Sequence, residues 1–96
     1  MQYLTLALVK KACAFIIRME RPLETLQQVI QLLSDRKIQV ESLQMHAAGG
    51  GEAILILHCQ VERDRIKHSQ HILERMQGVM GVELLESRGY HPVTTL

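Results

Sequence analysis

Apolar and polar residues follow one repeated order along the chain. Residues 13–47 run from an apolar stretch through a helical pattern to an alternating one, and residues 53–86 repeat this order. A continuous apolar run or a period of two indicates a strand, whereas apolar residues at intervals of three and four indicate an amphipathic helix. The chain therefore contains two successive β-α-β units, which predicts a βαββαβ domain of the α+β class.

The first unit contains the clearest helix signal. Ala12–Met19 is apolar except for Arg18, which is typical of a central strand or of one covered on both faces. Pro22 suits a first helical turn, and apolar residues then recur with helical spacing. We expect a helix here, and its predicted buried stripe consists of Leu23, Leu26, Val29, Ile30 and Leu33.

The next strand is expected over Ile38–His46, where apolar and polar residues alternate. The alternation changes parity between Val40 and Leu43, which predicts a bulge or a bend near Glu41–Ser42. Three glycines follow and predict a flexible hairpin turn. A phosphate-binding loop is a weaker interpretation, because no Gly-Lys-Ser/Thr motif follows and no helix is expected there.

The second unit has the same elements with weaker signals. Ala53–Val61 is a strongly apolar strand, and a helix is expected to begin near Asp64. Gly78 is expected to cap the C-terminus of this helix, and Val79–Leu85 to form the last strand, interrupted at Gly81. The stripe predicted to be buried on this helix consists of Ile66, Ser69 or Gln70, Leu73 and Met76.

Two helices on one face of a four-stranded antiparallel sheet form the ferredoxin-like arrangement. A chain of 96 residues supports one such domain and not two. We expect the domain over residues 12–87, since Lys10 and Lys11 interrupt the apolar pattern, and an irregular tail over residues 88–96. Residues 1–11 are open to three interpretations: an extra strand, a disordered arm, or a segment exchanged between dimer partners.

Composition points away from nucleic acid and membrane partners. The net charge is +1 with both signs interspersed, so the chain lacks the basic excess of a nucleic-acid-binding domain. One Phe, two Tyr and no Trp leave no aromatic platform for stacking RNA bases. The N-terminal pattern is unlike a signal peptide, and the sequence has no apolar run long enough to span a membrane. We therefore expect a cytoplasmic protein.

No catalytic or metal-binding motif stands out. Cys13 and Cys59 lie in apolar runs, where thiols are unreactive; they are expected to be small buried side chains, and a disulfide between neighbouring strands stays open. His68 and His71 share a helical spacing that suits a metal, but the apolar stripe places both on the solvated face. His58 and Cys59 point to opposite faces of a strand. We expect no enzyme, no metal site and no cofactor.

The residues FIIRMERPLETLQQVIQLLSDRKIQVESLQM resemble the first half of an ACT domain, in particular that of the regulatory small subunit of acetohydroxyacid synthase (acetolactate synthase). Val40–Leu43 (VESL) stands where those subunits commonly carry IESL, and the resemblance covers residues 13–87. It implies a regulatory subunit that binds and activates the catalytic large subunit in branched-chain amino acid biosynthesis. The alternative is a free-standing ACT-domain sensor of another amino acid.

The resemblance also implies an effector site. Such domains typically dimerise into one eight-stranded sheet, and a branched-chain amino acid binds where the first loop of one protomer meets the second strand of the other. Arg21 stands where many members have a ligand-contacting Asn, Glu24 where they have a loop glycine, and Gln39 where they have a second Asn. Because Glu24 adds bulk and negative charge, we expect weak or altered effector binding. The implied effector residues are Arg21, Pro22, Leu23, Glu24 and Gln39, and Lys37 replaces a usual glycine.

A homodimer is also expected from the sheet itself. In a sheet of this strand order the second strand is an edge, and apolar residues on an unpaired edge favour association. The predicted dimer edge consists of Ile38, Val40, Leu43 and Met45.

Overall fold

The computed structural model describes residues 10–86, in which the strands and helices follow the predicted βαββαβ order. The elements are β1 (Lys10–Glu20), α2 (Pro22–Asp35), β2 (Gln39–Gly49), β3 (Glu52–Glu62), the 3-10 turn η1 (Arg63–Arg65), α3 (Ile66–Glu74) and β4 (Val79–Glu86). β1 begins at Lys10, two residues before the expected start of the domain. The expectations for residues 1–9 and for the tail 88–96 lie outside the described residues.

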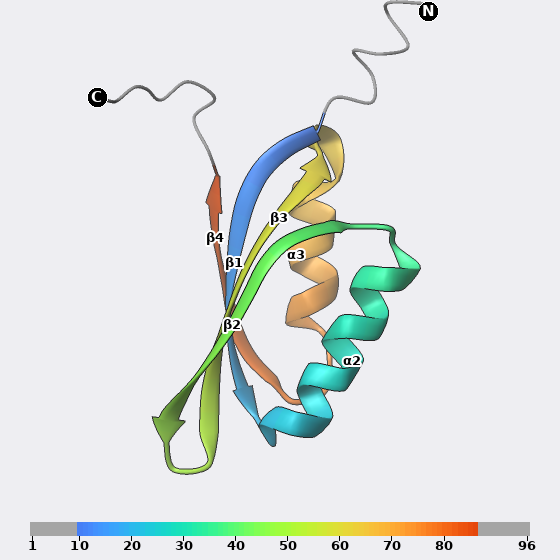
Figure 1. Cartoon of the computed structure of the whole chain (residues 1–96). Coiled ribbons are helices and arrows are strands. Elements are labelled where there is room, and N and C mark those ends of the chain that lie inside the picture. The colour runs from blue at the N-terminus through green and yellow to red at the C-terminus, as the bar shows by residue number, and fades with distance from the viewer. Residues whose placement is uncertain (1–9, 87–96) are drawn as a thin grey trace, which may run out of the picture.

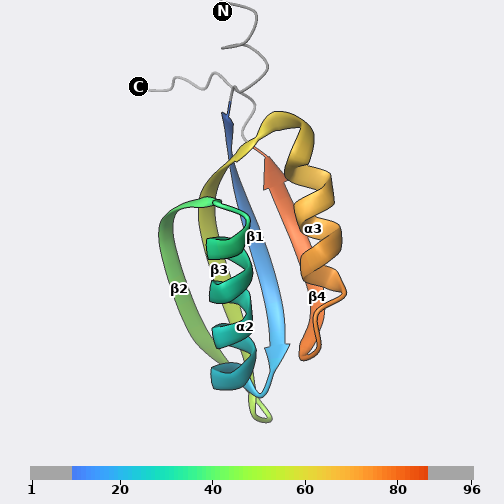
Figure 2. The ribbon, with the colours of Figure 1, turned by 90° about the vertical axis from the view of Figure 1, so that its right-hand side faces the viewer.

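The four strands form one antiparallel sheet in the order β2-β3-β1-β4. Both helices cover the same face of this sheet, as Figures 1 and 2 show. The ferredoxin-like α+β fold predicted from the sequence is therefore confirmed, with β2 and β4 as the two edge strands. No helix within residues 10–86 is both long enough and apolar enough to cross a lipid bilayer.

The core lies between the sheet and the two helices. Alternate residues of β1 and β3 point toward the helices and are buried, because successive side chains of a strand face opposite sides. The buried side chains of this layer are Phe15, Ile17, Met19, Leu55, Leu57 and Cys59 from the strands, Val29 and Leu33 from α2, and Ile66 and Leu73 from α3. On the opposite face Ile16, Ile54 and Ile56 are half-buried, while Arg18 and His58 are exposed.

The buried stripe of α2 differs from the predicted one. Val29 and Leu33 are buried as expected, but Thr25 takes the third position of the stripe. Leu23 and Ile30 are 71% and 48% exposed, so the prediction that they are buried is wrong. They lie seven residues apart, hence on one line of the helix surface. The helix is rotated so that this line falls outside its contact with the sheet.

The predicted bulge in the second strand is confirmed. The pairing of β2 with β3 shifts register between Val40 and Ser42, which leaves Glu41 without a partner residue in β3. This extra residue explains why the apolar positions change parity along β2. The glycine run forms the expected hairpin turn between β2 and β3, with positive φ angles at Gly49, Gly50 and Gly51.

The helix α3 ends earlier than expected. Its last residue is Glu74, and Arg75 caps it with an ordinary negative φ. Gly78 is not the C-cap, since it lies in the turn before β4 with a φ of 93°. Met76 also lies beyond the helix, although it packs against the core. Gly81 lies at the expected irregularity of β4, where the pairing with β1 shifts between Arg18 and Met19.

Lys37 adopts a conformation that favours glycine. Its φ is 56°, a left-handed value that costs a residue with a side chain about 1–2 kcal/mol. A glycine there loses about 0.5–1 kcal/mol through its flexibility, so Lys37→Gly is expected to raise the free energy of unfolding slightly, by about 0.5–1 kcal/mol. Urea unfolding followed by circular dichroism measures this change.

The neighbouring residue provides a matched control. Arg36 has an ordinary φ of −92°, so Arg36→Gly adds flexibility without relieving strain. It is expected to lower the free energy of unfolding by about 0.5 kcal/mol. If both glycine variants were destabilised equally, the left-handed conformation of Lys37 would carry no strain.

Candidate functional site

The loop between β1 and α2 turns through a single residue. Arg21 is the N-cap of α2 and has φ 47° and ψ 66°, which is the left-handed region. Pro22 follows as the first helical residue, and the Thr25 amide donates the first helical hydrogen bond to the Arg21 carbonyl, at 3.0 Å. The glycine-like conformation of this loop therefore falls on Arg21, whereas Glu24 lies in the first turn of the helix. The resemblance aligned the loop glycine of the family with Glu24, but the residue that adopts a glycine-like conformation is Arg21, three residues earlier.

One hydrogen bond fixes this loop to the other half of the molecule, and a second joins the two ends of the loop itself. The Glu20 amide donates to the Gly78 carbonyl at 2.9 Å, and the Thr25 hydroxyl donates to the Glu20 carbonyl at 2.7 Å. Thr25 is 2% exposed and is the one buried polar residue among those described. Its hydroxyl lies so close to Gly78 that a Cβ on that residue would collide with it. The loop thus depends on a glycine more than 50 residues away in the sequence.

Arg21 and Glu24 border a polar depression of about 380 Å³ at the start of α2. Their side chains form a loose ion pair, with 3.9 Å between Arg21 Nε and Glu24 Oε1, and both are more than half exposed. Such a pair contributes little to stability and opens readily. The remaining lining residues are Thr25, Gln27, Gln28 and Gln77.

The other implied effector residues do not join this depression within one chain. Leu23 is exposed, and Pro22 borders a separate apolar hollow of about 320 Å³ beside Met45 and Ala47. Gln39 pairs with Gln60, which in turn pairs with Ala12, eight residues from Glu20 along β1. At about 3.3 Å per residue, Gln39 lies roughly 26 Å from the Arg21 end of the sheet.

The edge strand β2 is exposed along its entire length. All eleven of its residues are exposed, although it pairs with β3 along one side. Val40, Leu43 and Met45 pair with buried residues of β3, so they point to the helix side of the sheet. They are 37–40% exposed because the helices do not extend over this edge. Ile38 differs from the other predicted edge residues, since it precedes β2 and packs against the core.

The two cysteines lie opposite each other in the core. Cys13 and Cys59 are paired residues of β1 and β3, both are free, and their sulfur atoms are 3.8 Å apart. The hydrogen bond between the two thiols raises the pKa of Cys59, and burial in apolar surroundings raises it further. His58 points to the opposite face of β3 and is exposed. Within residues 10–86 no three His, Cys, Asp or Glu residues gather as metal ligands.

The Cys59 thiol is expected to be unreactive in the folded protein. Because the thiolate is the reactive species, a raised pKa and a sulfur without solvent access both slow alkylation of Cys59. Iodoacetamide followed by peptide mass spectrometry should find Cys59 unmodified under native conditions and modified after unfolding in guanidinium chloride. Rapid native labelling would contradict the buried position.

Several residues of the loop region were missed from the sequence. Thr25 and Gln77 border the same depression as Arg21, and Gly78 holds the loop through its carbonyl. Thr25 follows the Pro22 signal by three residues, but no sequence pattern distinguishes a buried threonine from a solvated one. Gln77 and Gly78 meet the loop only because β4 pairs with β1.

Comparisons with known proteins place the fold. No protein family model matches the sequence, and no curated protein does. Among solved structures, the ACT domain from GTP pyrophosphokinase of Chlorobium tepidum is similar with a TM-score of 0.69 and 20% identity, over 80% of this chain and 100% of that one. A homoserine dehydrogenase from Thiobacillus denitrificans has a TM-score of 0.67 and 18% identity, over 84% of this chain and 18% of the enzyme.

A third similar structure is the C-terminal domain of the MgtC protein from Mycobacterium tuberculosis, with a TM-score of 0.66 and 13% identity, over 83% of this chain and 90% of that domain. At these identities the similarity concerns the backbone arrangement and not the side chains of the site. The chain has the fold of ACT domains.

Proposed function

We propose that the chain is a non-catalytic regulatory subunit that dimerises through β2 and binds an amino acid at the loop around Arg21. We further propose that it binds and activates the catalytic large subunit of acetohydroxyacid synthase. The observation that carries the proposal is the combination of an exposed β2, which among the described residues pairs only with β3, and a charged loop at one end of the same sheet.

Pairing through β2 would complete the effector site. If the β2 strands of two copies pair antiparallel, one copy is turned end to end relative to the other. Gln39 of the partner subunit then moves toward the Arg21 end of the sheet, although the two residues lie far apart within one chain. This arrangement is consistent with a single effector site that contains Arg21 of one copy and Gln39 of the other, as the sequence resemblance implies. Such a site would exist only in the dimer.

The loop has charges that suit an amino acid. An α-amino acid carries a carboxylate and an ammonium group, and the depression presents Arg21 and Glu24 side by side. The guanidinium of Arg21 suits a carboxylate, and Glu24 suits an ammonium group. Both side chains are solvent-exposed, so binding to one chain alone would be weak.

The similar structures support an accessory role. Two of them belong to enzymes, GTP pyrophosphokinase and homoserine dehydrogenase, and in the second this fold matches 18% of the chain. The fold thus occurs beside catalytic parts that are much larger than itself. The choice of acetohydroxyacid synthase rests on the segment VESL in β2 and on the residues around it.

Co-expression tests the proposed partner. The chain should co-purify with an acetohydroxyacid synthase large subunit from the same genome and raise its activity. The variant Leu43→Lys/Met45→Lys, which alters β2, should lose this activation if the dimer is the active form. Absence of both co-purification and activation would refute the assignment to this enzyme.

The alternative is a free-standing amino-acid sensor, which the charged depression favours independently of any enzyme. A thermal shift screen of the twenty amino acids should then raise the melting temperature for one or a few of them. Arg21→Ala should abolish the shift, while Arg18→Ala, which removes an exposed arginine outside the depression, should retain it. A flat screen would count against the sensor without affecting the partner test.

A further inference from the structure

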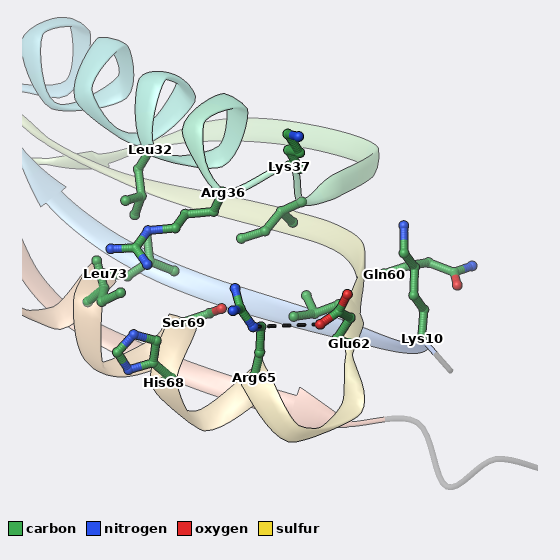
Figure 3. A pocket seen from close by; sticks show the side chains of 13 residues that line it. Lys10, Leu32, Arg36, Lys37, Gln60, Glu62, Arg65, His68, Ser69 and Leu73 are labelled. Carbon is green, nitrogen blue, oxygen red and sulfur yellow. Dashed lines mark ion pairs between the residues drawn. The ribbon is translucent and has the colours of Figure 1, made fainter. Parts of the chain in front are cut away.

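A second cleft lies at the end of the molecule opposite the Arg21 loop. It has a volume of about 370 Å³ and opens between the end of α2, the start of α3 and the end of β3 (Figure 3). Lys10 and Glu62, which are paired residues of β1 and β3, mark this end of the sheet, whereas Glu20 and Glu52 mark the other. The cleft therefore shares no residue with the candidate effector loop.

Positive charge is concentrated around this cleft. Lys10, Arg36, Lys37 and Arg65 line it, and Glu62 is its one carboxylate. The chain as a whole carries only one net positive charge, so the remainder of the molecule is net negative. Glu62 neutralises part of one arginine, since its Oε1 lies 3.6 Å from Arg65 Nε. Such a segregation of charge within a nearly neutral protein favours an anion at this place.

The cleft has donors directed inward and an apolar wall. In Figure 3 the side chain of Arg36 extends from the end of α2 toward α3, where His68 and Ser69 lie, and Arg65 approaches from the start of α3. Lys10 and Lys37 stand at its margin. The apolar lining consists of Leu32, Ile38, Val61, Ile72 and Leu73.

We propose that this cleft binds a small phosphomonoester with an apolar body, whose phosphoryl group lies between Arg36 and Arg65 and whose body lies against the partly exposed Leu32, Ile38 and Ile72. A guanidinium group offers a planar fork of donors that matches phosphate oxygens. The two guanidinium groups, the Ser69 hydroxyl and the His68 imidazole together provide more hydrogen-bond donors than the two oxygens of a carboxylate can accept. The cleft therefore suits a phosphoryl group better than a carboxylate. The volume is within the range of small-molecule pockets.

Another role for the basic residues is electrostatic stabilisation of a helix end. Arg36 and Lys37 follow the C-terminus of α2, where positive charge is favourable. That role does not account for Arg65, which lies in the turn before α3, nor for Lys10 on β1. A purely stabilising role predicts that Arg36→Gln lowers the melting temperature and leaves anion binding unchanged.

Phenyl phosphate, inorganic phosphate and benzoate are suitable probes, used in amide NMR titrations of the full chain at physiological ionic strength. Phenyl phosphate should give saturable shifts at residues 36–38 and 65–69 and should bind more tightly than inorganic phosphate or benzoate. Arg36→Gln and Arg65→Gln should each weaken its binding about tenfold or more. The Arg21 loop should not respond.

The matched control is Arg75→Gln, which removes the same charge from an exposed residue at the other end of α3. It should leave phenyl phosphate binding within about twofold of the parent chain. If all three variants weakened phenyl phosphate binding equally, the overall charge of the protein would explain the binding, and the proposed site would be refuted. Tighter binding of benzoate, or shifts that do not saturate, would overturn it as well.

Discussion

Replacing Gly78 with alanine is expected to lower the free energy of unfolding by about 3 kcal/mol, a large part of the stability of a domain of this size. The φ of 93° disfavours a side chain, which accounts for about 1–2 kcal/mol. The new Cβ would also collide with the Thr25 hydroxyl and disturb its hydrogen bond to the Glu20 carbonyl, which adds about 1 kcal/mol or more. Urea unfolding monitored by circular dichroism measures the difference.

Gly49→Ala separates the two contributions. Its φ of 85° is close to that of Gly78, but no atom of residues 10–86 lies within 4 Å of its Cβ position. It is therefore expected to lose only the backbone part, about 1–2 kcal/mol. If Gly49→Ala and Gly78→Ala were equally destabilised, the close approach of Thr25 to Gly78 would have no energetic importance.

The second large effect is expected on association. Leu43→Lys/Met45→Lys places two positive charges in each copy on the edge that the proposed dimer buries. Repulsion across the interface should raise the dimer dissociation constant about 100-fold or more. Both side chains are partly exposed in one chain, 37% and 39%, so the fold should persist. Analytical ultracentrifugation over a range of concentrations measures the constant, and circular dichroism verifies the fold.

Met80→Lys/Leu85→Lys is the matched control on the opposite edge strand. These residues of β4 are 46% and 56% exposed, so the charge added and the change in exposed apolar surface are similar. The control should remain dimeric at concentrations where the β2 variant is monomeric. The reverse outcome would locate the interface at β4, and a monomeric parent chain would refute the dimer altogether.

Local sequence patterns were sufficient to predict the elements. The apolar runs of β1 and β3, the spacing along α2, and the change of parity after Val40 each depend on residues that are close together in the chain. The rotation of α2 could not be predicted in this way. Whether Leu23 or Thr25 faces the sheet is decided by contacts with distant elements, and both lie at the margin of the apolar stripe.

The candidate sites depended more on topology than on pattern. The separation of Arg21 from Gln39 follows from the antiparallel order once the fold is accepted, since one residue follows β1 and the other begins β2. The basic cleft could not be predicted from the sequence, because the overall charge is close to neutral and the basic residues are far apart in the chain. Arg36 and Arg65 line the same cleft only because the end of α2 lies near the start of α3. The dependence of the loop on Gly78 had no signal at all in the sequence.

The exposure of β2 has a consequence for how the domain opens. Since none of its eleven residues is buried in one copy, this strand is attached mainly by its backbone ladder to β3, whereas β1 and β3 carry the core. In dilute solution the amide hydrogens of β2 should therefore exchange with solvent far sooner than those of β1. Raising the protein concentration should slow them selectively, so that hydrogen exchange at a single strand reports the population of dimer.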